Sequence, residues 1–143
     1  MKKLLFTLGV ALAVLAGTAT AAHAASPCQS VCDGKAPSYV YDSAACSDAT
    51  VVEDSVTRSG YTLRLMYSWW CQTAWAETDQ VGVTIRIQSF RNNGATLRRT
   101  EETGPTNNSF KYTRMVDDEV PFTAVACLAI PVSGGYGLCT RAF

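Results

Sequence analysis

Histidine is almost absent from the sequence: the only one among the 143 residues is His23. Because His23 lies in a segment that we predict to be removed, the mature chain is expected to contain none. Without an imidazole, the chain cannot form a Ser-His-Asp triad or a Cys-His pair, and it lacks the commonest protein ligand for transition metals. This absence excludes more functions than any motif in the sequence suggests.

The sequence also lacks an apolar run long enough for a comfortable membrane span of about 20 residues. Residues 4–17 form an apolar run that follows Lys2 and Lys3 and precedes the small-residue sequence Ala22-His23-Ala24. This order is typical of a cleaved secretory signal peptide, and a retained anchor is the alternative. We therefore expect residues 1–24 to be a signal peptide and residues 25–143 to be a single secreted domain without membrane contact.

An excess of positive charge is missing as well. Removal of Lys2 and Lys3 leaves ten basic residues facing twelve acidic ones, a formal charge of −2. Such a chain lacks the excess of basic residues that is typical of nucleic-acid-binding proteins. We expect a bacterial extracellular protein that is monomeric.

Cysteine, by contrast, is plentiful for so short a chain. The six are Cys28, Cys32, Cys46, Cys71, Cys127 and Cys139. An even number in an exported domain predicts three disulfides. A thiolate metal site is the alternative, but Cys28-x3-Cys32 has no matching second pair, so we expect neither a metal nor another cofactor.

The spacing of the cysteines does not select one pairing. We prefer Cys127–Cys139, because a turn at Gly134-Gly135 would bring the ends of two strands together. Cys32–Cys46 would close the N-terminal segment, and Cys28–Cys71 would then attach that segment to the body.

From Thr50 onward, short segments rich in β-branched and aromatic residues are separated by turn residues. Seven are predicted as strands: residues 50–57, 61–70, 81–88, 95–102, 109–116, 123–130 and 136–141. Alternation is clearest in the second and third, as in a sheet with one buried face. The polar fourth segment is expected at a sheet edge and the apolar sixth at a sheet centre.

No convincing amphipathic helix interrupts this series. The pattern predicts an all-β fold, a small disulfide-bonded antiparallel β-sandwich or barrel of about seven strands. Residues 25–49 carry three cysteines, prolines and a glycine, and we expect them to be an irregular, disulfide-bound lead-in.

Aromatic residues are densest in residues 67–75, which contain all three tryptophans. Flat apolar faces with polar edges suit a sugar ring or a peptide, whereas core packing beside a disulfide is the alternative. Strand alternation directs Trp69 inward and Trp70 outward. We take Tyr67, Trp70 and Trp75 as candidate binding residues.

No catalytic residue is predicted. Glu77, Asp79 and the acidic residues 117–119 could support glycoside hydrolysis or hold calcium, but such residues on a strand ordinarily form a solvated surface. Arg98-Arg99 on a hairpin could be a bait site for a protease, whereas protection of an edge strand explains the same residues.

The motif Leu65-Met66-Tyr67-Ser68-x-x-Cys71-x-Thr73-x-Trp75-Ala76 resembles the central motif of the YjfA-like secreted proteins, a family of unknown function common in actinobacteria. Residues 28–37, with Cys28-x3-Cys32-Asp33-Gly34-Lys35, are similar to the opening segment of that family, and residues 112–116 to a later one. Ala36, Glu77 and Arg114 depart from its pattern. The resemblance implies a six-cysteine secreted domain and leaves the function open.

The leading hypothesis is a non-catalytic secreted binding or interaction module that acts in the extracellular or cell-wall space. Its partner would be an extracellular protein or a cell-wall glycan. The alternatives are a secreted protease inhibitor with a loop near Arg98-Arg99 and a histidine-independent hydrolase that works through carboxylates.

Overall fold

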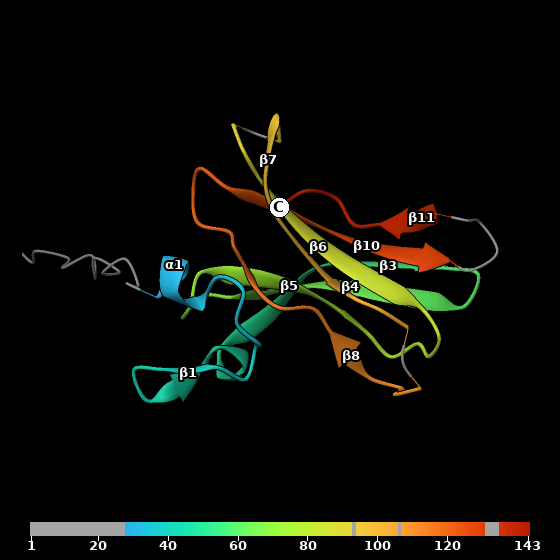
Figure 1. Ribbon diagram of the computed structural model, residues 1–143, viewed down its shortest axis with the longest axis horizontal. Helices are drawn as coiled ribbons and strands as arrows, with labels where there is room; N and C mark the ends of the chain where they lie inside the picture. The colour runs from blue at the N-terminus through green and yellow to red at the C-terminus, as the bar shows by residue number, and fades with distance from the viewer. Residues whose placement is uncertain (1–27, 93, 106, 131–134) are drawn as a thin grey trace, which may run out of the picture.

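Two antiparallel sheets packed face to face form the body of the chain in a computed structural model, which describes residues 28–92, 94–105, 107–130 and 135–143 (Figure 1). One sheet has the order β11 (Gly135–Cys139), β10 (Thr123–Ile130), β6 (Thr84–Arg91) and β7 (Thr96–Thr103). The other has the order β3 (Thr50–Arg58), β4 (Tyr61–Ser68), β5 (Thr73–Thr78) and β8 (Lys111–Tyr112). A short strand, β9 (Val116–Asp117), also pairs with β5.

The predicted fold class is confirmed: the chain is an all-β sandwich, and the sheets do not close into a barrel. β7 lies at a sheet edge and β10 lies between two strands, as their polar and apolar sequences predict. The predicted strand over residues 109–116 is divided into β8 and β9. The predicted signal peptide and Gly134 of the predicted Gly134-Gly135 turn lie outside the described residues, whereas Gly135 begins β11.

β5 is a central strand that the sequence pattern does not reveal. It pairs with β4 on one side and with β8 and β9 on the other. Ala74 and Ala76 face the other sheet, while Trp75 lies on the opposite face and is also buried. Because both faces are covered, β5 lacks the apolar–polar alternation that identifies a half-exposed strand.

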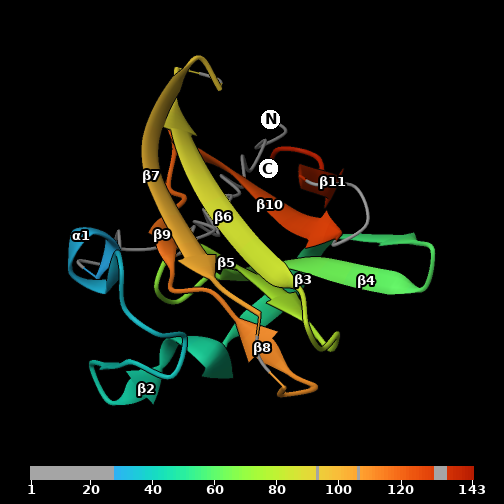
Figure 2. The same cartoon turned by 45° about the vertical axis from the view of Figure 1, so that its right-hand side comes forward.

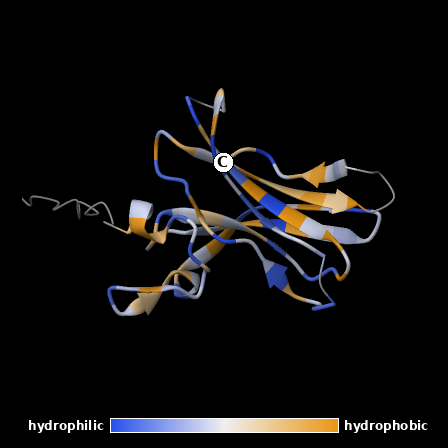
Figure 3. Cartoon of the chain, viewed as in Figure 1, coloured by the Kyte–Doolittle hydropathy of each residue, from blue (hydrophilic) through white to orange (hydrophobic). Residues whose placement is uncertain are grey.

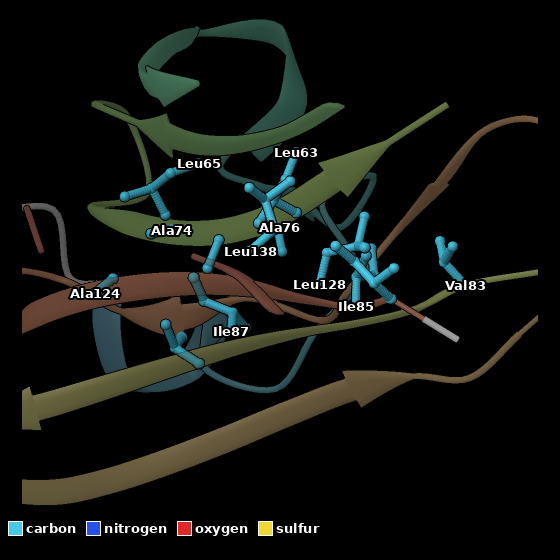
Figure 4. Close-up of a cluster of buried hydrophobic side chains, with 13 residues drawn as sticks. Leu63, Leu65, Ala74, Ala76, Val83, Ile85, Ile87, Ala124, Leu128 and Leu138 are labelled. Atoms are coloured by element: carbon cyan, nitrogen blue, oxygen red, sulfur yellow. The ribbon is translucent and has the colours of Figure 1, made fainter. Parts of the chain in front are cut away.

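The main hydrophobic core fills the space between the two sheets. Figure 4 shows Leu63, Leu65 and Ala76 of the second sheet opposite Ile85 and Leu128 of the first. Apolar and polar residues alternate along β6 (Figure 3), because only one face of that strand points into this core. Burial of such side chains, at roughly 25 cal/mol per Å² of apolar surface, is the main force that holds the sheets together.

A second cluster of buried residues lies on the outer face of the β3–β4–β5 sheet, beneath the N-terminal segment. That segment contains α1 (Gln29–Cys32), the short hairpin of β1 (Val40–Tyr41) and β2 (Ala44–Ala45), and the 3-10 helix η1 (Cys46–Asp48); Figure 2 shows α1 and β2 beside the sandwich. The buried members of the cluster are Cys28, Cys32, Cys46, Cys71, Trp75 and Met115. The N-terminal segment therefore forms a partial third layer.

Within the described residues, no helix has the length and apolar character that a membrane crossing requires.

Candidate functional site

The candidate site is a groove where the N-terminal segment meets β5 and β8, and we call it the aromatic groove. Its volume is about 230 Å³, and the residues that line it are Pro37, Ser38, Ser47, Trp75, Glu77, Phe110 and Tyr112. Trp75 and Glu77 are two residues apart on β5, so strand geometry places both side chains on the same face of the sheet. These two residues form one wall of the groove.

The strand β8 and the residue before it, Phe110, supply the aromatic rim. Lys111 points inward, where its ammonium donates a hydrogen bond of 2.8 Å to the carbonyl of Val83, and desolvation lowers the pKa of this lysine. Alternation along the chain then turns Phe110 and Tyr112 outward, and they are 53% and 40% exposed. Their rings pack edge to face with centroids 6.2 Å apart. Two large aromatic surfaces thus remain open to a ligand.

The opposite wall is held in place by a disulfide. Cys46, at the start of η1, is bonded to Cys71 in the turn after β4. The neighbouring Ser47 donates its backbone N–H to the carbonyl of Pro37 at 2.9 Å, which joins two parts of the wall. The groove therefore depends on the attachment of the N-terminal segment to the sheet.

The disulfide pairing near the groove corrects the sequence-based preference. The structure joins Cys28 to Cys32 and Cys46 to Cys71, and it does not form the expected Cys32–Cys46 and Cys28–Cys71 bonds. The reason is local: α1 is one turn long, and residues four apart lie on the same face of a helix. In the other sheet, Cys127 of β10 is joined to Cys139 of β11, the pair expected from the sequence.

Glu77 gives the groove a carboxylate whose charge is balanced within the protein. Burial raises the pKa of Glu77, while the nearby Arg64 charge and a hydrogen bond with Trp75 oppose that rise. The guanidinium of Arg64 lies 3.6 Å from the Glu77 carboxylate and 3.5 Å from that of Asp79. Glu77 is therefore suited to accept a hydrogen bond from a neutral ligand rather than to pair with a cation.

Of the three candidate binding residues, Trp75 alone lines the aromatic groove. Trp70 is half-buried against the cysteines and donates its indole N–H to the carbonyl of Tyr41 at 3.3 Å. Tyr67 packs on the inter-sheet core and meets the ring of Phe143 edge to face. The structure therefore does not bring the three residues together.

The expectation that Trp69 points inward is wrong, since its side chain is 56% exposed. β4 ends at Ser68, and the chain then turns through Gln72, which has a positive φ of 52°. Strand alternation stops at the end of the strand, so it cannot be extended to Trp69.

Arg98 and Arg99 lie within β7 and are joined to the N-terminal segment by ion pairs. The carboxylate of Asp33 lies 3.1 Å from the guanidinium of Arg98 and 3.2 Å from that of Arg99. Arg98 also lies 3.5 Å from Asp117, and Arg99 pairs with Glu101. A bait site needs freely presented side chains, so this geometry favours a structural role for the two arginines.

The acidic residues considered for hydrolysis lie in different surroundings. Of the described residues that line the groove, Glu77 alone carries a carboxylate. Asp117 is paired in register with Thr73, at the other end of β5 from Glu77. Glycoside hydrolysis ordinarily requires two carboxyl groups about 5–9.5 Å apart on either side of the scissile bond. The groove itself offers no such pair.

Asp118 is an unusual carboxyl outside the groove. It is 7% exposed, and neither of its oxygens has a hydrogen-bond partner among the described residues. Burial, followed by the charges of Asp117 and Glu53, raises the pKa of Asp118 to about 8. This carboxyl is therefore largely protonated at neutral pH.

The sequence reading missed most of the groove. Ser38, Ser47 and Phe110 lie in segments without a strong pattern, and they meet only after the N-terminal segment has folded onto the sheet. One usable signal was the alternation of Phe110, Lys111 and Tyr112, in which two aromatic residues flank a polar one. The signal for Glu77 was its place two residues after Trp75 in an extended segment.

Comparison with protein-family models matches residues 30–127 to one family, described as "Protein of unknown function (DUF2690)". No curated protein and no solved structure matches the chain. The matched range includes the groove and four of the six cysteines: Cys32, Cys46 and Cys71 in its first part and Cys127 at its end.

Proposed function

Because the chain belongs to the DUF2690 family, whose function is unknown, we propose a function from the geometry: the protein is a non-catalytic binding module that holds a sugar ring in the aromatic groove. The observation that carries this proposal is the meeting of two exposed aromatic rings, a charge-balanced carboxylate and two serines in one groove. Aromatic faces pack against the C–H faces of sugars, and carboxylate and hydroxyl groups bond to their hydroxyls.

The balance of charge selects the class of ligand. A cationic ligand would also be attracted to aromatic faces beside a carboxylate. Arg64, however, already occupies the position of a counter-ion 3.6 Å from Glu77. A neutral, hydroxyl-bearing ligand keeps that ion pair intact and still uses the free acceptor capacity of the carboxylate.

The size of the groove limits how much of a ligand it holds. Its volume of about 230 Å³ is below the roughly 300–1,000 Å³ of pockets for drug-sized molecules. One ring of a longer chain fits this space, with the rest of the chain outside. Glycans of the bacterial cell wall have this form, and an extracellular protein partner that carries a sugar would meet the same requirement.

The proposed place of action is outside the cytoplasm. Support comes from the predicted signal peptide over residues 1–24 and from three disulfides, which persist in oxidising compartments. We also propose that the chain is related to the YjfA-like secreted proteins of actinobacteria. This relationship is supported by the ordered motif from Leu65 to Ala76.

Isothermal titration with soluble, uncrosslinked glycan chains from bacterial cell walls tests this function. The double variant Phe110→Ala/Tyr112→Ala is expected to weaken binding by tenfold or more, because each aromatic contact contributes about 0.5–1.5 kcal/mol beyond its buried area. Glu77→Gln keeps the shape of the wall but removes the charged acceptor, and a smaller loss is expected.

Trp69→Ala serves as the matched control, since it removes an exposed aromatic side chain that does not line the groove. Its affinity for the glycan is expected to equal that of the unaltered protein. The proposal is wrong if no cell-wall glycan binds, or if Trp69→Ala weakens binding as much as the groove variants do.

A further inference from the structure

Four of the six cysteines come from three separate segments and meet at one point. Cys28 directly precedes α1 and Cys32 ends it, Cys46 begins η1, and Cys71 lies in the turn after β4. Their sulfur atoms all lie within 4.8 Å of one another, and all four residues are fully buried. Two disulfides therefore lie side by side, with the sulfurs of Cys32 and Cys46 separated by 3.7 Å without a bond between them.

The four sulfurs are gathered within reach of a single tetrahedral metal centre. Zinc binds cysteine sulfur at about 2.3 Å, which places the four sulfurs of a tetrahedral site about 3.8 Å apart. The limit of 4.8 Å exceeds that value by about 1 Å. The bonded sulfurs of Cys46 and Cys71 must instead separate by about 1.8 Å once the bond is reduced, since a disulfide holds its sulfurs about 2.0 Å apart. Side-chain rotation can make changes of this size. We propose that, when these two disulfides are reduced, the same four thiolates form a site for one Zn²⁺ ion.

The surroundings of the four sulfurs suit such a site. Trp75 and Met115 are buried against them, and Tyr39 packs on the same cluster, so water has little access. The ammonium of Lys35 lies 5.7 Å from the centre of the ring of Tyr39, the residue that packs on this cluster. Within the described residues, no other group of three or more potential ligands brings its atoms as close together.

Reduction and metal binding convert the two-disulfide form into the zinc-bound form, and oxidation reverses the change. Each disulfide takes two electrons and two protons to become two thiols, with a phosphine as reductant that leaves as its oxide after gaining oxygen from water. Zn²⁺ then displaces four protons from the four thiols. In the reverse direction, two molecules of hydrogen peroxide accept four electrons and four protons to give water, two disulfides re-form and Zn²⁺ is released.

Cobalt(II) titration of the phosphine-reduced protein, under anaerobic conditions, tests the site. We expect a single Co²⁺ per chain, with the thiolate-to-cobalt absorption and the intense visible bands of tetrahedral coordination, and with displacement by Zn²⁺. Hydrogen peroxide is expected to abolish this spectrum and to release the metal to a chromogenic chelator.

Two variants separate the site from general thiol binding. Cys127→Ser/Cys139→Ser leaves the four sulfurs in place and should give the full spectrum, whereas Cys32→Ser/Cys46→Ser removes two ligands and should weaken metal binding at least a hundredfold. Circular dichroism of each reduced variant, with and without metal, reports whether loss of binding reflects loss of the fold. The proposal is overturned if the reduced, folded protein gives no tetrahedral cobalt spectrum, or if Cys32→Ser/Cys46→Ser binds as tightly as the unaltered protein.

Discussion

Replacing Asp118 by Asn is expected to stabilise the fold in a strongly pH-dependent way. The pKa of Asp118 is raised from 3.8 to about 8, first by burial and then by the negative charges of Asp117 and Glu53. Between these two pH values the unfolded chain releases the proton while the folded chain retains it. The free energy of unfolding of the unaltered protein therefore falls as pH rises from about 4 to about 8, and this contribution is constant at higher pH.

The magnitude follows from the difference in pKa. Each pKa unit corresponds to about 1.4 kcal/mol, so at pH 7 the ionisation of Asp118 in the unfolded chain disfavours folding by up to about 4 kcal/mol. An asparagine has nearly the same shape and does not titrate. The variant should thus gain up to that amount of stability at pH 7 relative to the unaltered protein, and much less at pH 4.

Urea unfolding at several pH values between 4 and 9, followed by tryptophan fluorescence, measures this difference. Leu65→Ala is the control: it removes a fully buried, non-titrating side chain, and it should lower stability by about 2–5 kcal/mol at every pH. A stability difference between Asp118→Asn and the unaltered protein that does not change between pH 4 and 8 would refute the reasoning.

Two further predictions concern the attachment of the N-terminal segment. Asp33→Ala leaves the partly buried guanidinium of Arg98 without its closest partner, and a loss of about 3 kcal/mol is expected in urea unfolding. Arg141→Ala removes a side chain that is 88% exposed and should change stability by less than about 1 kcal/mol; equal effects would contradict the argument. Cys46→Ser/Cys71→Ser opens a bond between residues 25 apart, which should lower stability by about 3 kcal/mol and also weaken glycan binding. The same change at the Cys127–Cys139 bond should lower stability comparably but leave the glycan affinity unaltered.

The strands with one exposed face could be predicted from the sequence, and the strand that carries the site could not. In β6, Ile85 and Ile87 face the core while their neighbours are only partly covered, which produces the alternation that identifies a strand. In β5, the small Ala74 and Ala76 face one buried layer and Trp75 faces another. Alternation disappears when both faces are buried, and alanine has little preference for strands.

The groove was harder to predict because it forms between segments distant in the sequence. Tryptophan density points to Trp75, which lines the groove. It points equally to Trp70, whose indole donates a hydrogen bond to the backbone of Tyr41 within the cysteine cluster. The alternation of Phe110, Lys111 and Tyr112 indicates that both rings lie on one face, but their exposure can be read only from the folded chain. The pairing of four neighbouring cysteines likewise depends on where three segments meet, which spacing does not reveal.

The most direct test of the aromatic groove is a two-dimensional NMR titration with soluble cell-wall glycan chains. The three indole N–H signals form a built-in comparison, because Trp75 lines the groove while Trp69 and Trp70 do not. If a sugar binds in the aromatic groove, the Trp75 indole and the backbone amides of Phe110 and Tyr112 shift together in a saturable manner. Saturable shifts centred on Trp69 or Trp70, or no shifts with any glycan, would contradict binding there.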